Sequence, residues 1–388
     1  MFAYEIFKVI YSPFKAFKEI IQNPKYTGPI LAMILFIAAN VGSVYAAISR
    51  TYVEQTLPTA SQLDEWTENC TLWTSGSGAE IRCSDDNIDG NYYGNKSIEF
   101  SIEESKHIWM QLITTEPVNC SNIEGYKNMS FRIKLILSTT TELNNASILL
   151  HSSLADYFYY DMTEHFTPLN NNVWNNLTIA VGPESGQWVN STANADWGNI
   201  TSLRFELTWP EDINVTVRLD GLFFRGIFRS LAENASIYVL NFSVSAFMQF
   251  TIKWVLLSGL LYIVGKALGA KTVWKTLLIL VGFALIILFI QALITAATYT
   301  TLPTLYYPLE LIGGVEGETE IAYDKILEDT WLVSQVTSYV QIGMHIWIIA
   351  LCAIALRLLA EFSWAKGIIV SSVAYFVTLL VESFIFGF

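Results

Sequence analysis

The chain has 388 residues, a hydrophobic fraction of 52% and a mean hydropathy of +0.39, which is too apolar for an ordinary soluble protein. Its charge is unevenly distributed, because residues 51–235 carry 24 acidic and 10 basic side chains whereas the remainder carries 11 and 12. An acidic segment repels nucleic acid and anionic lipid, which excludes nucleic acid as a partner. The composition predicts a membrane module interrupted by a soluble insertion.

Residues 1–28 predict a cytoplasmic amphipathic leader. Its apolar side chains recur at helical spacing, and its lysines lie on the opposite face. Ser12 followed by Pro13 is typical of a helix start, so we expect two short helices, the second ending at Asn23-Pro24. The apolar face is expected either to lie among lipid headgroups or to pack under the helix bundle.

Five apolar stretches are long enough to cross a bilayer as helices. They cover residues 29–49, 244–264, 276–298, 336–356 and 367–386, and Lys253 is the charged residue that interrupts the second. The first resembles a cleavable signal peptide, but its length favours a retained signal anchor. We therefore divide the chain into the leader, the first span, an insertion over residues 50–238 and a four-span segment over residues 239–388.

The distribution of basic residues predicts the orientation. With a cytoplasmic N-terminus, the inside segments hold nine basic residues against three acidic ones. The loop at 299–335 is then external and acidic, and the C-terminus is external. We predict a multi-pass protein of the plasma membrane, in contact with the lipid bilayer.

Sequons for N-linked glycosylation cluster between the first and second spans. Their asparagines are Asn69, Asn95, Asn119, Asn128, Asn145, Asn176, Asn190, Asn199, Asn214, Asn234 and Asn241. Because glycosylation needs an external or luminal compartment, the cluster predicts that N-linked glycans cover the insertion.

The insertion itself predicts an all-β fold. Short stretches rich in β-branched and aromatic residues alternate with Gly, Asn, Asp and Pro, which favours an antiparallel sandwich or jelly roll. The expected strands cover 97–102, 108–114, 129–137, 147–151, 174–181, 202–208 and 215–224. The predicted fold class is thus a five-helix membrane bundle plus an extracellular jelly roll between helices 1 and 2.

The order of these strands resembles the galactose-binding-like jelly roll found in many carbohydrate-binding modules. The resemblance covers roughly residues 65–226 and is carried by residues 122–126 leading into 129–134, by 174–179, by 197–205 and by 219–224. It implies a fold that hosts sugar binding, protein binding and structural roles. Most tryptophans, including Trp174 and Trp197, are expected in the core. The aromatic residues expected on loops, and so the candidate ligand-binding residues, are Tyr157, Tyr159, Tyr160 and Trp188.

Asp85, Asn87 and Asp89 place oxygen ligands at alternate positions before Gly90, as at the start of a calcium loop. Lys96 stands where such a loop needs glutamate, so an acidic surface turn is the alternative. The jelly-roll resemblance adds Asp220 as a further candidate ligand for a structural calcium ion.

Three cysteines lie in the insertion and Cys352 in the fourth span. Cys70 with Cys83 is the preferred disulfide, and Cys83 with Cys120 is the alternative. The Cys and His spacings do not suggest zinc.

The spans carry few polar residues, namely Asn40, Lys253, Gln291, Gln341, His345, Ser371, Ser372 and Glu382. They hold no aspartate and no Gly-x-Ser-x-Gly motif, and the chain has no phosphate-binding glycine loop. We therefore predict no catalytic residues and no enzyme.

The membrane segment resembles the Yip1 family, whose eukaryotic members act in vesicle trafficking and membrane shaping. The resemblance is carried by the leader over residues 12–24, typical of prokaryotic and archaeal Yip1 domains, and it covers residues 5–50 and 240–388. The sequence lacks the eukaryotic Asp-Leu-Tyr-Gly-Pro motif and inserts a domain after the first span, which puts a link to Rab GTPases in doubt. A glycosylated insert on this plan suggests an archaeal cell-surface protein.

The sequence favours a non-enzymatic membrane scaffold whose external domain engages a glycan, a surface-layer protein or a membrane protein. It is compatible with an oligomer. One alternative is a transporter or channel subunit lined by Lys253, Gln291, His345 and Glu382. Another is a membrane enzyme acting on lipid-linked sugars through the acidic residues at 310–329.

Overall fold

The computed structural model describes residues 2–76, 78–137, 141–167 and 169–387. The chain forms two compact units. The helical unit comprises residues 1–51, 230–305 and 327–388, and the β-unit comprises residues 52–229 and 306–326. Each unit is therefore assembled from segments that are far apart in the sequence.

The leader forms helices α1 (Phe2–Tyr11) and α2 (Pro13–Gln22), with Pro13 at the first position of the second. Ile6, Val9 and Phe17 are fully buried and belong to the core of the helical unit. The apolar face of the leader thus packs against the bundle, which was one of the two expected arrangements.

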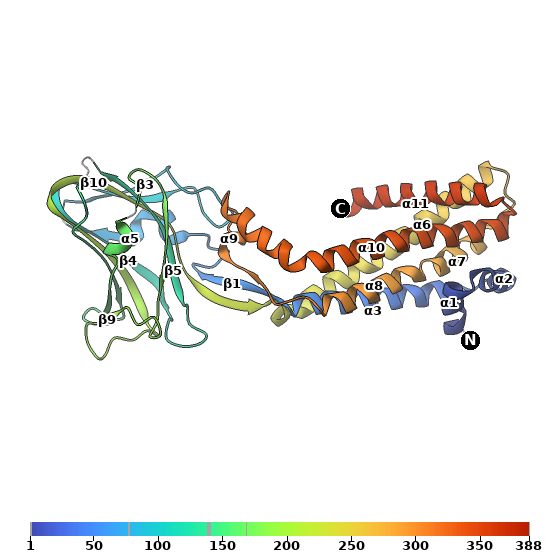
Figure 1. Cartoon of the computed structure of the whole chain (residues 1–388), viewed down its shortest axis with the longest axis horizontal. Coiled ribbons are helices and arrows are strands. Elements are labelled where there is room, and N and C mark those ends of the chain that lie inside the picture. The colour runs from blue at the N-terminus through green and yellow to red at the C-terminus, as the bar shows by residue number, and fades with distance from the viewer. Residues whose placement is uncertain (1, 77, 138–140, 168, 388) are drawn as a thin grey trace. The chain divides into compact units, whose positions relative to one another are not determined.

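Five helical stretches are long and apolar enough to cross a membrane, and they run side by side in the helical unit (Figure 1). They are α3 (Thr27–Ile48), α6 (Ala235–Ala267), α7 (Trp274–Ala284) with α8 (Ile286–Tyr299), α10 (Glu318–Ala360) and α11 (Trp364–Phe386). Gly28 lets α3 approach α7 closely, because a Cβ at this position would collide with the ring of Phe283. The five predicted spans are confirmed, and the chain is a multi-pass membrane protein.

The β-unit contains eleven strands among its described residues, and short helices and loops connect them. The strands are β1 (Thr51–Leu57), β2 (Trp73–Ser75), β3 (Glu80–Ser84), β4 (Ser97–Val118), β5 (Asn128–Leu137), β6 (Asn145–His151), β7 (Tyr157–Asp161), β8 (Asn175–Ala180), β9 (Val189–Asn190), β10 (Ile200–Ser230) and β11 (Leu305–Tyr307). The short helices are α4 (Glu65–Glu68), η1 (Cys70–Leu72), α5 (Thr163–Phe166) and α9 (Leu309–Ile312), and η2 (Leu231–Asn234) precedes α6 in the helical unit.

Two long strands, β4 and β10, contribute to both layers of an antiparallel sandwich. Residues 200–208 of β10 pair with the second half of β4 and with β6. Residues 215–225 pair with β5, and residues 215–219 also pair with the first half of β4. Register shifts between Thr208 and Ile213 mark the change of layer, as a β-bulge does. The separately predicted strands at 97–102 and 108–114, and those at 202–208 and 215–224, are thus halves of single strands.

Alternation along the strands builds the core of the sandwich. Leu203, Phe205 and Leu207 of β10 and their partners on β6 point inward and are fully buried. The rings of Phe131 and Phe205 lie 4.9 Å apart and join the two layers. The predicted all-β sandwich between the first and second membrane helices is confirmed.

The expected loop at 299–335 is largely ordered secondary structure. It holds β11, α9 and the first turns of α10, and residues 306–326 belong to the β-unit. The acidic residues of the first α10 turns lack the apolar pattern of a span, so hydropathy alone placed them in a loop. The β-unit is therefore entered by the chain at two separate places.

Arg225 joins the three segments that the chain contributes to the β-unit. Its guanidinium donates to both carboxylate oxygens of Glu54 on β1, at 2.8–2.9 Å, and to both of Glu310 on α9, at 2.6–2.7 Å. The Glu54 carboxylate also accepts the backbone N–H groups of Gly226 and Leu309. Burial raises the pKa of Glu310, but the hydrogen bond and charge of Arg225 outweigh it, so the pKa lies below its usual value.

A second ion pair holds the start of α10 in the β-unit. Arg132 on β5 donates to Glu318 from both terminal nitrogens, at 2.9 and 2.7 Å, and to the Tyr93 hydroxyl at 3.1 Å. Its side chain is 8% exposed. Two of the acidic residues at 310–329 are thus committed to structural ion pairs.

Replacing Arg225 with methionine tests the clamp. The Glu54 side chain is 2% exposed, and its charge would be left buried without a partner, so we expect a loss of about 3–5 kcal/mol in unfolding free energy. Urea unfolding of the detergent-solubilised chain measures it. Arg82→Met is the control, because the exposed Arg82–Glu80 pair should change stability by less than about 1 kcal/mol. Equal losses in the two variants would contradict the clamp.

Candidate functional site

One face of the sandwich carries aromatic and polar side chains in register. Where residues 203, 205 and 207 of β10 point into the core, Arg204 and Glu206 point outward, opposite Leu149 and Ser147 of β6. Across the next strand, Tyr157 and Tyr159 of β7 lie opposite His151 and Leu149. We call this surface the outer sheet face, formed by Trp109, Gln111, Ser147, Leu149, His151, Tyr157, Tyr159, Arg204 and Glu206.

Contacts among these side chains fix their orientation. The guanidinium of Arg204 lies 4.4 Å from the ring centroid of Trp109 and pairs with the Glu206 carboxylate at 2.6 Å. The rings of His151 and Tyr157 are 5.3 Å apart. The face thus presents partly exposed aromatic rings and charged groups that neighbouring strands hold in place.

Three buried polar atoms of this face have no hydrogen-bond partner among the described residues. They are Ser147 Oγ, His151 Nε2 and Arg204 Nε. Burial, followed by the charge of Arg204, lowers the pKa of His151 below its usual value, so its ring is neutral at pH 7. The exposed parts of the Arg204 and Glu206 side chains are charged groups of this face that can donate to and accept from hydroxyl groups of a ligand.

The predicted ligand-binding residues do not form one site. Residues 157–161 are strand β7 rather than a loop, and alternation divides the tyrosines between its two faces. Tyr157 and Tyr159 lie on the outer sheet face, whereas Tyr160 is 6% exposed and points inward. The Tyr160 ring packs 5.1 Å from Trp188, whose indole donates to the Ala180 carbonyl at 2.8 Å.

The sequence-based prediction of ligand-binding residues did not include His151, Arg204 or Trp109. The signal that could have found them was period-two alternation in β6 and β10, which places polar residues between buried ones. Trp197 stacks on Phe158 at 3.8 Å and is 9% exposed, as expected of a core residue.

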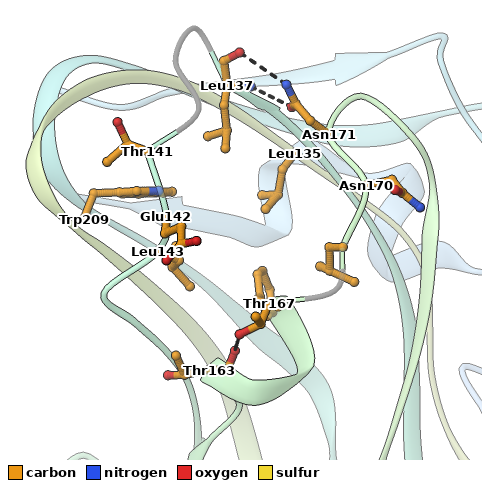
Figure 2. A pocket seen from close by; sticks show the side chains of 12 residues that line it. Leu135, Leu137, Thr141, Glu142, Leu143, Thr163, Thr167, Asn170, Asn171 and Trp209 are labelled. Atoms are coloured by element: carbon orange, nitrogen blue, oxygen red, sulfur yellow. Dashed lines mark hydrogen bonds between the residues drawn. The ribbon is translucent and has the colours of Figure 1, made fainter.

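A pocket of about 310 Å³ lies at an end of the sandwich (Figure 2). Buried Leu135, Phe166 and Trp209 line it together with polar residues, among them Thr163 and Asn171. The Trp209 indole N–H has no hydrogen-bond partner in the described part of the chain. Asn171 is held by hydrogen bonds with the backbone of Leu137 (Figure 2).

Cys70 and Cys83 form a disulfide, which confirms the preferred pairing. Cys120 is a buried free thiol, and burial raises its pKa to about 12, so it is unreactive at neutral pH.

The structure does not gather the predicted calcium ligands. Asp85 is ion-paired with Lys96, and the Asn87 amide donates to the carbonyls of Ile88 and Gly94. Asp89 is exposed. Within the described ranges, no three acidic, His or Cys side chains lie close enough together to hold a metal ion. Asp85, Asn87, Asp89 and Asp220 therefore do not fit a common calcium site here.

Asp220 instead belongs to a buried carboxyl pair with Asp64. Asp220 is 1% exposed, and its oxygens accept the N–H of Ile88 at 2.6 Å and of Gly221 at 2.8 Å. The Asp64 oxygens accept from Gly94 N–H and from Thr67. Burial, together with the charge of Asp64, raises the pKa of Asp220 to about 8.

This pair predicts a pH dependence of stability. The folded pKa lies above the unfolded value of about 3.9, so the stabilisation by protonated Asp220 is complete below about pH 4 and is lost as the pH rises toward about 8. Asp220→Asn cannot ionise, so its unfolding free energy relative to wild type should rise by up to about 1.4 kcal/mol per pH unit in this window.

Urea unfolding at several pH values between 5 and 8 measures this difference. Asp89→Asn, at an exposed position, is the control and should run parallel to wild type. A parallel curve for Asp220→Asn as well would contradict the raised pKa.

A known protein family matches most of the helical unit. Residues 214–385 match the Yip1 domain. This match includes the end of β10 and the helices from α6 to α11, but not the leader or α3. No curated protein sequence matches the chain.

Solved structures resemble the β-rich part of the chain. A structure of carbohydrate-binding modules from the β-sandwich superfamily has 13% identity and a TM-score of 0.27; the match covers 40% of this chain and 57% of that one. A family 11 carbohydrate-binding module from Clostridium thermocellum, in complex with a mixed-linked tetrasaccharide, has 14% identity, coverages of 44% and 94%, and a TM-score of 0.29. A xylan-binding domain from Paenibacillus barcinonensis has 12% identity, coverages of 41% and 85%, and a TM-score of 0.24.

Proposed function

We propose that this Yip1-domain membrane protein is a non-enzymatic cell-surface scaffold whose β-unit binds an oligosaccharide chain across the outer sheet face. The Yip1 domain over residues 214–385 supplies most of the membrane-spanning helices. The β-unit supplies a surface of chemistry suited to sugars. Surface-layer or membrane glycoproteins that carry such chains are the partners that this surface would reach.

The observation that carries the proposal is the set of partly exposed aromatic rings and charged groups that lie side by side on the outer sheet face. The Arg204 guanidinium and the Glu206 carboxylate are each 26% exposed, and the guanidinium lies 4.4 Å from the ring centroid of Trp109. Tyr157 and Tyr159 flank them on β7. Sugar hydroxyls can bond the exposed parts of the Arg204 and Glu206 side chains, while the apolar faces of sugar rings pack on aromatic side chains.

The dimensions of the face favour a chain of sugars over a single one. Its residues span four adjacent strands, β4, β10, β6 and β7, which at roughly 4.8 Å per strand corresponds to about 14 Å. A surface of that width contacts more than one sugar ring. A linear oligosaccharide lying across the strands is therefore the ligand that we propose.

The absence of an enzymatic role is also part of the proposal. Yip1 domains are generally non-catalytic. The acidic residues that a membrane enzyme would need include Glu310 and Glu318, and both are occupied by arginine ion pairs.

We further propose that the β-unit is extracellular, the N-terminus cytoplasmic and the asparagine acceptors glycosylated. The excess of lysine and arginine at the proposed inner ends of the spans supports this orientation. Most acceptors have exposed side chains, namely Asn69, Asn95, Asn176, Asn190, Asn199, Asn214, Asn234 and Asn241.

Binding to immobilised oligosaccharides tests the proposed site. We expect the purified full-length chain to bind a member of a panel of cello-, xylo- and manno-oligosaccharides. Tyr159→Ala and Arg204→Ala should each weaken that binding at least 10-fold, because each removes a contact surface or donor of the outer sheet face. Tyr323→Ala, which removes an exposed tyrosine of α10, is the control and should bind like wild type.

Two results would overturn the assignment of the site. Undiminished binding in both outer-face variants would place the sugar elsewhere. Loss of binding in Trp209→Phe but not in Tyr159→Ala would assign it to the end pocket.

Glycopeptide mass spectrometry of the native protein tests the glycosylation pattern. We expect sugars on exposed acceptors and an unmodified Asn145, whose half-buried side chain accepts a hydrogen bond from Thr163 at 3.3 Å. A sugar on Asn145, or no sugar at any acceptor, would contradict this expectation.

A further inference from the structure

A polar cavity of about 430 Å³ lies within the helical unit. Six of the eight polar residues of the spans line it, although they come from five different helical segments: Asn40, Lys253, Gln291, Gln341, His345 and Glu382. Gln249 and Thr337 add further polar groups. In a bilayer, polar side chains face such a shared interior because exposure to lipid is costly.

An ion pair lies in the cavity wall. Lys253 Nζ of α6 is 3.1 Å from Glu382 Oε2 of α11, and the two side chains are only 5% and 7% exposed. Two ions held at this depth must neutralise each other, since the desolvation of either one alone is unfavourable. The cavity therefore contains strong hydrogen-bonding groups but no net charge from this pair.

The pair leaves hydrogen-bonding capacity unused. Glu382 Oε1 and Thr337 Oγ1 are buried and have no partner among the described residues. Glu382 Oε1 can only accept while the carboxylate is ionised, and Thr337 can donate or accept. Because side-chain amides that both donate and accept also line this space, a ligand with hydrogen-bond donors and acceptors suits it.

The cavity occupies one half of the bundle. Val44 and Tyr299 line it near the ends of α3 and α8, and Phe242 near the start of α6. From Phe242 to Lys253 the helix rises about 16 Å, roughly half of a hydrocarbon core of about 30 Å. The cavity thus extends over about half the length of a membrane-crossing helix.

We propose that this cavity binds the uncharged, hydroxyl-rich headgroup of a membrane lipid, such as a glycosyl diacylglycerol. The hydroxyls would donate to Glu382 Oε1 and exchange hydrogen bonds with Thr337 and the side-chain amides. The apolar part of the wall, which includes Phe36, Leu288 and Leu379, suits the start of the acyl chains.

Charged headgroups fit the cavity less well. An anionic phosphate would meet the Glu382 carboxylate and would have to separate Lys253 from it. A cationic group would meet Lys253 in the same way. An uncharged donor-rich group pairs with the free oxygen and leaves the ion pair intact, so it is the chemistry that the cavity favours.

Native mass spectrometry of the detergent-solubilised full-length chain tests the proposal. The probes are glucosyl diacylglycerol, diacylglycerol with the same acyl chains, and phosphatidylglycerol. We expect the glucosyl lipid to be retained at least 10-fold more than either other lipid, and methyl glucoside at equal concentration not to displace it. Displacement by methyl glucoside would identify a free sugar as the ligand and would overturn the lipid assignment.

Variants locate the binding. The double variant Lys253→Met with Glu382→Met removes both charges together, and Gln291→Leu changes only the wall, which keeps the test valid if the double variant does not fold. Both are expected to lose the preference for the glucosyl lipid. Lys8→Met with Glu19→Met removes another ion pair of the helical unit and is expected to retain it.

Three outcomes would overturn the proposal. These are preferential retention of phosphatidylglycerol, an unchanged preference in Gln291→Leu, and solute flux in proteoliposomes that is abolished by the same cavity variants. The flux result would assign the cavity to a transport pathway. The proposal does not depend on oligosaccharide binding by the outer sheet face, so either can fail alone.

Discussion

The ion-pair cluster around Arg225 is the constraint on which the β-unit depends. The chain enters this unit at β1, leaves it after β10 and returns to it at β11. A single guanidinium binds the carboxylates of Glu54 and Glu310 from the first and last of these segments. Because the cluster is buried, removing any one partner would leave an unpaired charge in a region of low dielectric constant and would destabilise the fold. The same buried carboxylate of Glu54 orders two backbone N–H groups, so the local chain path and the charge pairing support each other.

The candidate binding surface follows from this frame through β10. One end of that strand carries Arg225, and the other end carries Arg204 on the outer sheet face, so a single strand connects the ion-pair cluster with the candidate binding surface. Alternation then separates roles residue by residue: Phe205 fills the core while Arg204 and Glu206 face outward. Outward-facing residues can therefore be substituted to suit a different ligand without changing the residues of the core.

Much of the architecture could be predicted from the sequence, because its determinants are local. Span length, the leader's helical periodicity and the Cys70–Cys83 spacing require no knowledge of distant contacts. The fusion of the predicted strands into β4 and β10 could not be predicted, since polar residues at the bends resemble turns until both neighbouring strands are in place. The start of α10 was assigned to a loop for a related reason. Its acidic residues look like a polar loop in the sequence, and only the fold shows that Glu318 pairs with the distant Arg132.

Only some residues of the candidate site could be predicted from the sequence. Tyr157 and Tyr159 were identified by residue type, but assigning their run to a loop grouped them with Tyr160, which alternation in β7 directs into the core. The structure does not bring the predicted calcium ligands together, because Asp85 pairs with Lys96 and Asp220 belongs to a buried carboxyl pair. In the spans, composition identified Lys253 and Glu382, and only the packing of the helices brought them together.

Hydroxyl-radical footprinting of the full-length chain, with and without the oligosaccharide that binds it best, tests the central claim most directly. If that oligosaccharide lies across the outer sheet face, Tyr157, Tyr159 and Trp109 become protected in proportion to occupancy, while Tyr323 and the residues of the end pocket remain unchanged. Protection confined to the end pocket, or none on β6, β7 and β10 at saturating ligand, would contradict the account.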